Sequence, residues 1–143
     1  MSLDLFGQLN WLAVLAAAIV YFALGAAWYL PATPTGRAWM KATGFEMRAD
    51  RPQPNPAIYL APLAAYIVAS AATATLSRAT STDTLGEAVV LGLLVGIGYA
   101  LTLWFVAAAF DPQKPQPWVW FAINGSYHIV ALLLVAVIVS LWR

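Results

Sequence analysis

Four long apolar stretches constrain this chain more than any other feature of its sequence. They cover residues 11–30, 57–77, 88–110 and 118–142, and no Asp, Glu, Lys or Arg interrupts any of them. A helix rises about 1.5 Å per residue, so each stretch can cross a hydrocarbon layer about 30 Å thick. Transmembrane strands would be shorter and would alternate apolar with polar residues. Because a helix satisfies its own backbone hydrogen bonds in lipid, the sequence predicts four transmembrane helices.

The composition agrees with a membrane protein. Hydrophobic residues make up 62% of the chain and charged residues only 9%, less than half the usual charged share of a soluble domain. A net charge of +1 argues against a nucleic-acid partner held by a basic surface. The absence of cysteine excludes thiolate catalysis, iron–sulfur clusters and zinc–thiolate sites. We therefore expect one all-α integral membrane bundle over residues 1–143, with the lipid bilayer as its surroundings.

The connections between the stretches support this division. Residues 31–56 contain five prolines and six of the 13 charged residues of the chain. Residues 78–87 form a short polar segment, and residues 111–117 contain three prolines. Proline ends a helix because it lacks the amide donor. The short connection at 111–117 makes stretches 88–110 and 118–142 antiparallel neighbours. Pro62 predicts a kink near the start of stretch 57–77.

The basic residues predict which way the bundle faces. Those on the loops 31–56 and 111–117 are Arg37, Lys41, Arg48, Arg51 and Lys114, whereas Arg78 and Arg143 lie on the side of the two termini. Cytoplasmic loops carry an excess of Lys and Arg. We therefore expect both loops in the cytoplasm and both termini outside.

The loop segment 36–47 has two interpretations. It could form a short helix in the membrane interface, with Arg37, Lys41 and Arg48 facing anionic headgroups and Trp39 dipping into the acyl boundary. It could equally be an ordinary loop that follows the cytoplasmic bias of basic residues.

Polar side chains recur near the middle of the stretches. Counting residues from the stretch ends places four of them about 14 to 17 Å from an interface: Tyr21, Tyr66, Tyr99 and His128. Asn124 shares a helix face with His128, and Thr102 lies near Tyr99. One hypothesis is a polar cluster inside the bundle that relays a proton, binds a small polar ligand or holds a lipid headgroup, with His128 titrating near neutral pH. The other hypothesis is that these groups form hydrogen bonds between helices, each of which contributes about 0.6 to 2 kcal/mol to the stability of the bundle. Depth alone does not decide between them.

Small residues at helical spacing predict close helix packing. The candidates are Gly25, Ala61, Ala65, Gly92, Gly96 and Ala100. In lipid, helices associate through close backbone approach rather than through a hydrophobic driving force. These rows suit packing within one chain or between copies of it.

Several short motifs resemble a known family. They are Asn10-Trp11, the segment 25–29 (GAAWY), the segment 36–39 (GRAW), Thr43-Gly44 and the segment 123–128 (INGSYH). Together they resemble the bacterial family called domain of unknown function 1761. Arg37 stands where that family commonly has Lys, and the proline-flanked link at 31–34 is unusual for it. The resemblance implies a four-span membrane protein of the bacterial cytoplasmic membrane with no assigned activity and no catalytic residue to transfer.

The remaining polar residues offer no legible reaction chemistry. Glu87 and Asp111 flank opposite ends of stretch 88–110, too far apart to act as a catalytic pair about 5 to 9 Å apart. No His and carboxylate residues have metal-ligand spacing. We therefore expect no enzyme activity, no metal and no cofactor. The leading hypothesis is a structural or accessory component that packs with itself or with a larger membrane complex. The alternative is a small homo-oligomeric transporter or channel that uses the Tyr/His/Asn cluster.

Overall fold

The computed structural model describes residues 4–46, 55–111 and 113–143. All regular elements in these ranges are helical. In chain order they are α1 (Asp4–Gly7), α2 (Trp11–Trp28), α3 (Pro34–Thr43), the 3-10 helix η1 (Pro56–Tyr59), α4 (Leu60–Ala79), α5 (Leu85–Val95), the π-helix η2 (Gly96–Leu101), α6 (Thr102–Phe110) and α7 (Pro117–Leu141).

The expected four spans are confirmed. Four helical segments are long and apolar enough to cross a membrane: Trp11–Trp28, Pro56–Ala79, Leu85–Phe110 and Pro117–Leu141. Their ends differ from the expected ends by no more than three residues. Of the two interpretations of segment 36–47, the structure supports a short helix, which is α3.

Local capping explains where these helices begin and end. The Asn10 side chain accepts hydrogen bonds from two backbone amides of the first turn of α2. Thr84 and Glu87 form a reciprocal capping box at the start of α5, which satisfies amides that have no partner within the helix. Gly44 ends α3 in a left-handed conformation with φ of 67°, which glycine adopts without a steric cost.

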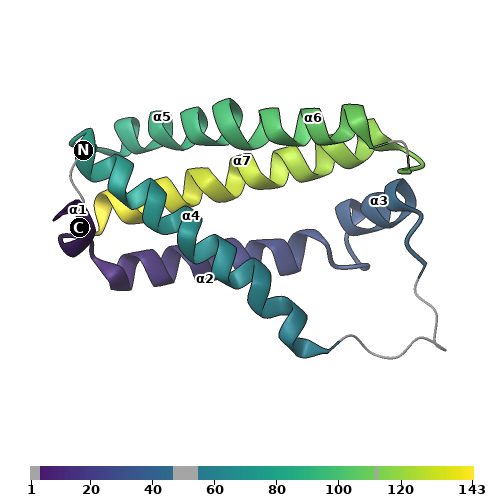
Figure 1. Cartoon of the computed structure of the whole chain (residues 1–143), viewed down its shortest axis with the longest axis horizontal. Helices are drawn as coiled ribbons and strands as arrows, with labels where there is room; N and C mark the ends of the chain where they lie inside the picture. The colour runs from purple at the N-terminus through teal and green to yellow at the C-terminus, as the bar shows by residue number, and fades with distance from the viewer. Residues whose placement is uncertain (1–3, 47–54, 112) are drawn as a thin grey trace.

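Helix α7 is the centre of the bundle (Figure 1). Helices α5 and α6 run along one side of α7 and α2 runs along another, while α4 crosses obliquely over α2 and α7. Helix α1, the C-terminus and the turn before α5 lie at one end, and α3 lies at the other end near the start of α7. We call the second end the loop end. As expected, the third and fourth spans are antiparallel neighbours.

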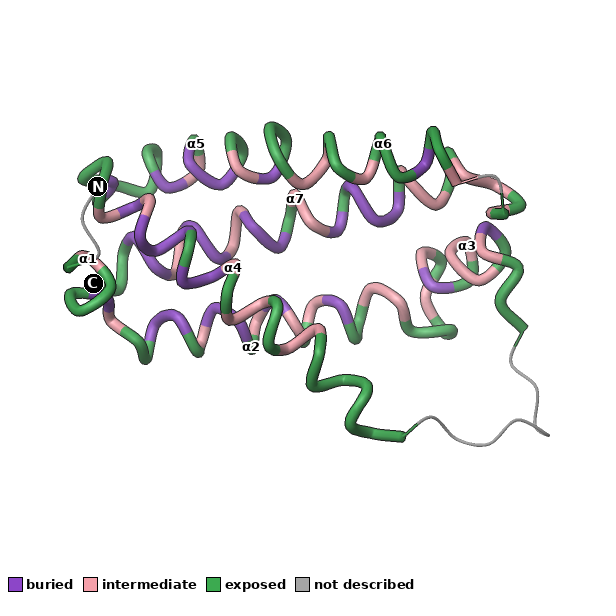
Figure 2. The backbone as a smooth tube through the Cα atoms, in the orientation of Figure 1, coloured by how far each residue is buried: buried purple, intermediate pink, exposed green. Residues whose placement is uncertain are grey.

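Buried residues are concentrated in α7, and the first turns of α4 are not buried (Figure 2). Tyr127 and Val135 of α7 are almost fully buried, whereas α4 has no buried residue before Ser70. Ala61 and Ala65, which we expected at a helix interface, are therefore exposed. The reason is the oblique path of α4, because its first turns leave the bundle before they can pack. The 3-10 helix η1 precedes those turns.

Glycines allow the closest helix contacts of the bundle. A Cβ atom on Gly92 would lie 2.7 Å from the Cα atom of Leu133, and one on Gly96 would lie 3.1 Å from the Cα atom of Ile129. A Cβ atom on Gly25 would lie 2.7 Å from the hydroxyl oxygen of Tyr127. Small residues in the third span thus bring its backbone against α7, as close packing in lipid requires.

Candidate functional site

A tyrosine and a histidine form the centre of the candidate site. The Tyr21 hydroxyl of α2 and Nδ1 of His128 in α7 share a hydrogen bond of 2.5 Å. The Tyr66 ring of α4 stacks on the Tyr21 ring, with centroids 4.1 Å apart and planes 11° apart. The Trp104 ring of α6 stacks on His128 at 5.3 Å. All four spanning segments therefore contribute a side chain to this centre.

Asn124 extends the polar contacts one helical turn toward the loop end. Its Nδ2 donates to the backbone carbonyl of Trp120 at 2.7 Å. Its Oδ1 accepts a hydrogen bond of 2.7 Å from the Tyr29 hydroxyl. The amide is thus held from two sides, and Tyr29 ties the end of α2 to α7.

Four of the six expected cluster residues converge and two do not. Tyr21, Tyr66, Asn124 and His128 lie in this cluster. Tyr99 is 70% exposed, and the Thr102 hydroxyl donates to carbonyls of its own helix. Tyr99 and Thr102 therefore lie outside the cluster.

The π-helix η2 explains why Tyr99 faces outward. In an uninterrupted α-helix, Tyr99 would follow Gly92 by two turns and would face α7 with it. The i to i+5 bonding of a π segment inserts one extra residue into the repeat, so later positions turn back by about 100°. Ala100, Trp104 and Ala108, four residues apart, then face inward, and Ala108 is buried. The π turn brings Trp104 to His128.

Sequence reasoning missed the tryptophans of the site. Trp120 lies four residues before Asn124 and eight before His128, so its shared helix face was a signal that could have found it. No spacing in the sequence indicated that Trp104 belongs to the site, because only the π turn brings its side chain to His128. One interpretation of segment 36–47 had Trp39 dipping into the acyl boundary; in the structure its ring contacts Tyr29 at 5.7 Å between centroids.

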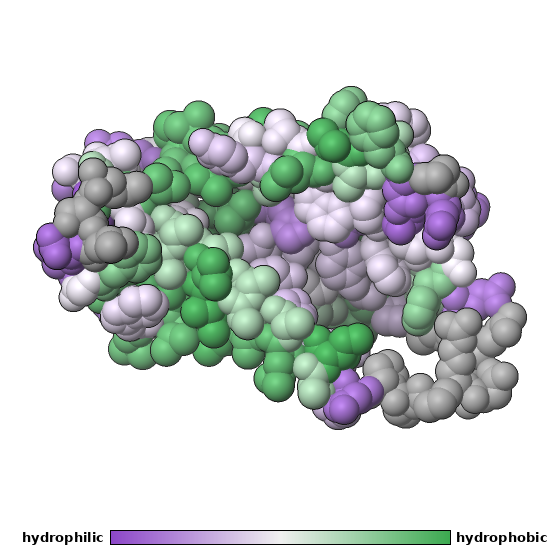
Figure 3. Space-filling view, in the orientation of Figure 1, coloured by the Kyte–Doolittle hydropathy of each residue, from purple (hydrophilic) through white to green (hydrophobic). Residues whose placement is uncertain are grey.

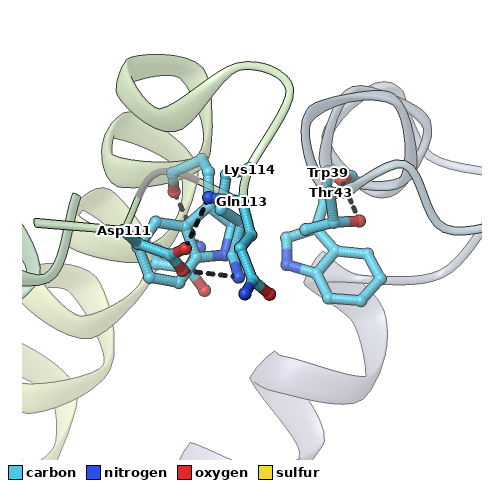
Figure 4. Close-up of polar contacts among 7 residues, drawn as sticks. Trp39, Thr43, Asp111, Gln113 and Lys114 are labelled. Carbon is cyan, nitrogen blue, oxygen red and sulfur yellow. Dashed lines mark hydrogen bonds and ion pairs between the residues drawn. The ribbon is translucent and has the colours of Figure 1, made fainter.

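A pocket of about 730 Å³ lies beside this cluster at the loop end. Figure 3 shows weakly polar side chains gathered toward this end, between α4 and α5–α6, whereas apolar side chains dominate much of the half near the termini. In the close-up, Trp39 faces Gln113 and Lys114 across a gap (Figure 4). The lining residues are Trp39, Thr43, Gly44, Phe45, Glu46, Trp104, Lys114, Trp120 and Asn124.

One ion pair organises the rim of this pocket. Lys114 Nζ lies 2.9 Å from an Asp111 carboxylate oxygen and 4.8 Å from the centroid of the Trp120 ring. The Gln113 backbone amide also donates to Asp111. The hydrogen bonds from Lys114 and Gln113 lower the pKa of the Asp111 carboxyl. Because that pKa is lowered, the pair persists through neutral pH and is lost only as pH falls through the lowered value.

A second cavity, of about 550 Å³, opens between α2 and the start of α4. Its lining is mostly apolar: Phe22, Gly25, Ala26, Tyr29, Leu30, Pro31, Tyr59, Pro62 and Tyr66. Tyr29 lines this cavity, and its hydroxyl bonds to Asn124 of the 730 Å³ pocket. Tyr29 therefore stands between the two spaces.

The residues expected to contact lipid headgroups separate into three groups. Arg37 and Lys41 are exposed on α3, as such a role requires. Trp39 faces the pocket, and Arg48 lies outside the described residues. Helix α3 packs on α7, and the Gln116 amide donates to the Ala42 carbonyl at 3.2 Å. The helix therefore forms a wall of the site.

Among the described residues, no group of three or more His, Asp or Glu side chains could hold a metal ion. A family model described as a protein of unknown function (DUF1761) matches residues 12–140. That range contains the four spans except the first residue of the first span and the last residue of the fourth, and it contains every residue of the cluster and pocket. No curated protein and no solved structure matches the chain.

Proposed function

This chain belongs to the protein family of unknown function DUF1761, and from that premise we propose that it binds and passes a small polar solute across the membrane. The proposed route leads from the loop-end pocket to the Tyr21–His128 pair. The pair has a binding role in this proposal rather than a role in covalent chemistry. This is the transporter or channel interpretation of the cluster.

The hydrogen bond between Tyr21 and His128 carries the proposal. The two side chains come from the middle of separate spans, where ionisable groups are costly and mark solute or proton routes by default. His128 also stacks on Trp104, whose side chain lines the pocket. The mid-membrane pair and the pocket are thus contiguous, which packing alone does not require.

We place the loop end in the cytoplasm of a bacterial cell, with the bundle in the inner membrane. Arg37, Lys41 and Lys114 all lie at that end, and cytoplasmic loops are enriched in basic residues. The pocket then opens toward the cytoplasm. Accessibility of a cysteine placed at position 37 to a membrane-impermeant thiol reagent reports this sidedness.

Replacing His128 with phenylalanine should abolish solute movement while the bundle stays folded. Phenylalanine keeps a ring against Trp104 but cannot bond to Tyr21. Proteoliposomes are to be challenged with gradients of choline, glutamate, phosphate or protons, and the currents measured on a solid-supported membrane. We expect at least one gradient to give a current above that of protein-free liposomes, and the His128→Phe variant to reduce it at least tenfold.

Tyr99→Phe is the matched control, since Tyr99 has a similar depth but faces outward, and it should keep the wild-type current. An Asn124→Leu variant tests the rest of the cluster. Unchanged currents in both His128→Phe and Asn124→Leu would exclude the cluster from transport, and no current with any gradient would exclude transport of these solutes.

A structural role in an assembly is the second candidate function. Ala57, Ala61 and Ala65 are spaced four residues apart and are exposed on η1 and on the first turns of α4, which leave the bundle. Small residues on an unoccupied helix face let another membrane helix approach closely. A second copy of this chain would fit that face.

An Ala61→Cys variant tests this assembly, because the natural chain has no cysteine. In native membranes under mild oxidation we expect a crosslinked dimer on a non-reducing gel. Leu103→Cys is the control, since Leu103 is 70% exposed on a different span, and it should crosslink at least fivefold less. Equal crosslinking at the two positions would indicate random collision and contradict the assembly.

A further inference from the structure

Two tryptophans form an aromatic corner in the loop-end pocket. The Trp104 and Trp120 ring centroids are 4.8 Å apart and the ring planes are 74° apart. Trp39 lines the same pocket from α3. The face of an indole ring carries negative charge density and attracts cations. A space bounded by several such rings is the arrangement that proteins use to recognise organic ammonium groups.

The corner already holds an ammonium group that belongs to the protein. Lys114 Nζ lies 4.8 Å from the centroid of the Trp120 ring. The Asp111 carboxylate contacts the same nitrogen at 2.9 Å, so the cation has both an aromatic and an anionic partner. The Lys114 side chain is 26% exposed, and it lies at the rim rather than in a closed core. A lysine at this position can therefore leave the ring by rotating about its side-chain bonds.

The charges around the pocket favour a cation over an anion. Lys114 is the single basic residue among those that line it, and Glu46 is acidic. Asp111 neutralises Lys114 from outside the lining. Toward the bundle interior the pocket ends at Asn124, which is neutral. With the Lys114 ammonium displaced, a ligand would meet indole faces and the Asp111 carboxylate.

We propose that this pocket binds a small organic cation of the alkylammonium or quaternary ammonium class, with Lys114 as a tethered competitor for the same aromatic corner. Its volume of about 730 Å³ is within the range of small-molecule sites. That this cation is also the transported solute rests on the proposed function. Binding itself does not depend on transport.

Choline and its uncharged carbon isostere, 3,3-dimethyl-1-butanol, test the proposal. Binding of each to the full chain is to be measured by calorimetry in maltoside micelles, which carry no ammonium group. Replacing Lys114 with methionine removes the competitor while keeping an apolar chain over Trp120. We expect the Lys114→Met variant to bind choline at least tenfold more tightly than the natural protein, and the isostere at least tenfold more weakly than choline.

Two further variants identify the groups that bind the cation. In the Lys114→Met background, Trp120→Leu and Asp111→Asn should each weaken choline binding about tenfold. The Lys41→Met variant is the matched control, because it removes one exposed positive charge from the same end of the molecule. It should leave choline binding unchanged. Thermal unfolding in the same micelles confirms that each variant is folded, and Lys114→Gln replaces Lys114→Met if that variant is unstable.

Three results would overturn the proposal. They are equal choline binding by the natural protein and both Lys114 variants, equal binding of choline and the isostere, and a gain in the Lys41→Met variant as large as that at Lys114. The outcome is separable from the transport proposal. Choline binding without any current would contradict the proposed function alone, whereas a current of another solute without choline binding would contradict this inference alone.

Discussion

Replacing Gly36 with alanine is expected to lower the thermal midpoint of unfolding by about 10 °C, the largest effect of any single added methyl group. Gly36 is buried near the start of α3. A Cβ atom there would lie 2.0 Å from the Leu30 carbonyl oxygen and 2.9 Å from the Tyr29 carbonyl carbon. Both are backbone atoms, which cannot rotate away as the end of a side chain can.

The turn around Gly36 has little freedom to adjust. The Thr33 side chain accepts from the Gly36 amide at 3.0 Å and donates to the Leu30 carbonyl at 2.7 Å. The Thr35 hydroxyl donates to the Trp28 carbonyl at 2.6 Å. An added methyl group must break these bonds or move α3 away from the bundle. We therefore expect a cost above about 3 kcal/mol.

Tryptophan fluorescence during heating in micelles measures this effect. Gly86→Ala is the control, since Gly86 is a helical glycine with no atom within 4 Å of an added Cβ. It should leave the midpoint unchanged or raise it slightly. A Gly36→Ala variant as stable as Gly86→Ala would contradict the close contact between α3 and the end of α2.

Tyr127→Ala is expected to cost about 3 to 5 kcal/mol, because it empties the middle of the core. Tyr127 is 1% exposed. Its ring contacts Tyr21, Tyr29 and His128, with centroid distances from 4.7 to 5.6 Å. Its hydroxyl donates to the Tyr21 carbonyl at 3.1 Å. Truncation removes the ring that positions the three side chains of the site.

Two variants separate ring packing from other effects. Tyr127→Phe keeps the ring and loses only the hydroxyl bond, so it should cost about 1 kcal/mol. Tyr99→Ala removes the same side chain from a position that is 70% exposed, so its effect should stay below about 1 kcal/mol. Equal destabilisation by Tyr127→Ala and Tyr99→Ala would contradict the central position of Tyr127.

Part of the candidate site was predictable from the sequence. Tyr21, Tyr66 and His128 were expected at one depth, and Tyr21 contacts both Tyr66 and His128. Asn124 was expected on the same helix face as His128, and it lines the loop-end pocket. Depth is predictable because it follows from counting residues along a helix. The tryptophan corner was not, because Trp104 reaches it only through the π turn at residues 96–101.

The number of spans, their approximate ends and the placement of both termini at one end were determined by the sequence alone. A hydrocarbon layer demands an apolar run of fixed minimum length, and an even number of crossings returns the chain to its starting side. Only the tertiary structure decided which face of each span turns inward. The spans are apolar on nearly every side, and lipid is as apolar as a protein core, so no contrast between faces marks the inward side. Contacts between helices decide which face of each span turns inward. The close contact of Gly92 with Leu133 orients the third span, and the π turn then directs Trp104 inward and Tyr99 outward. The oblique path of α4 leaves Ala61 and Ala65 uncovered.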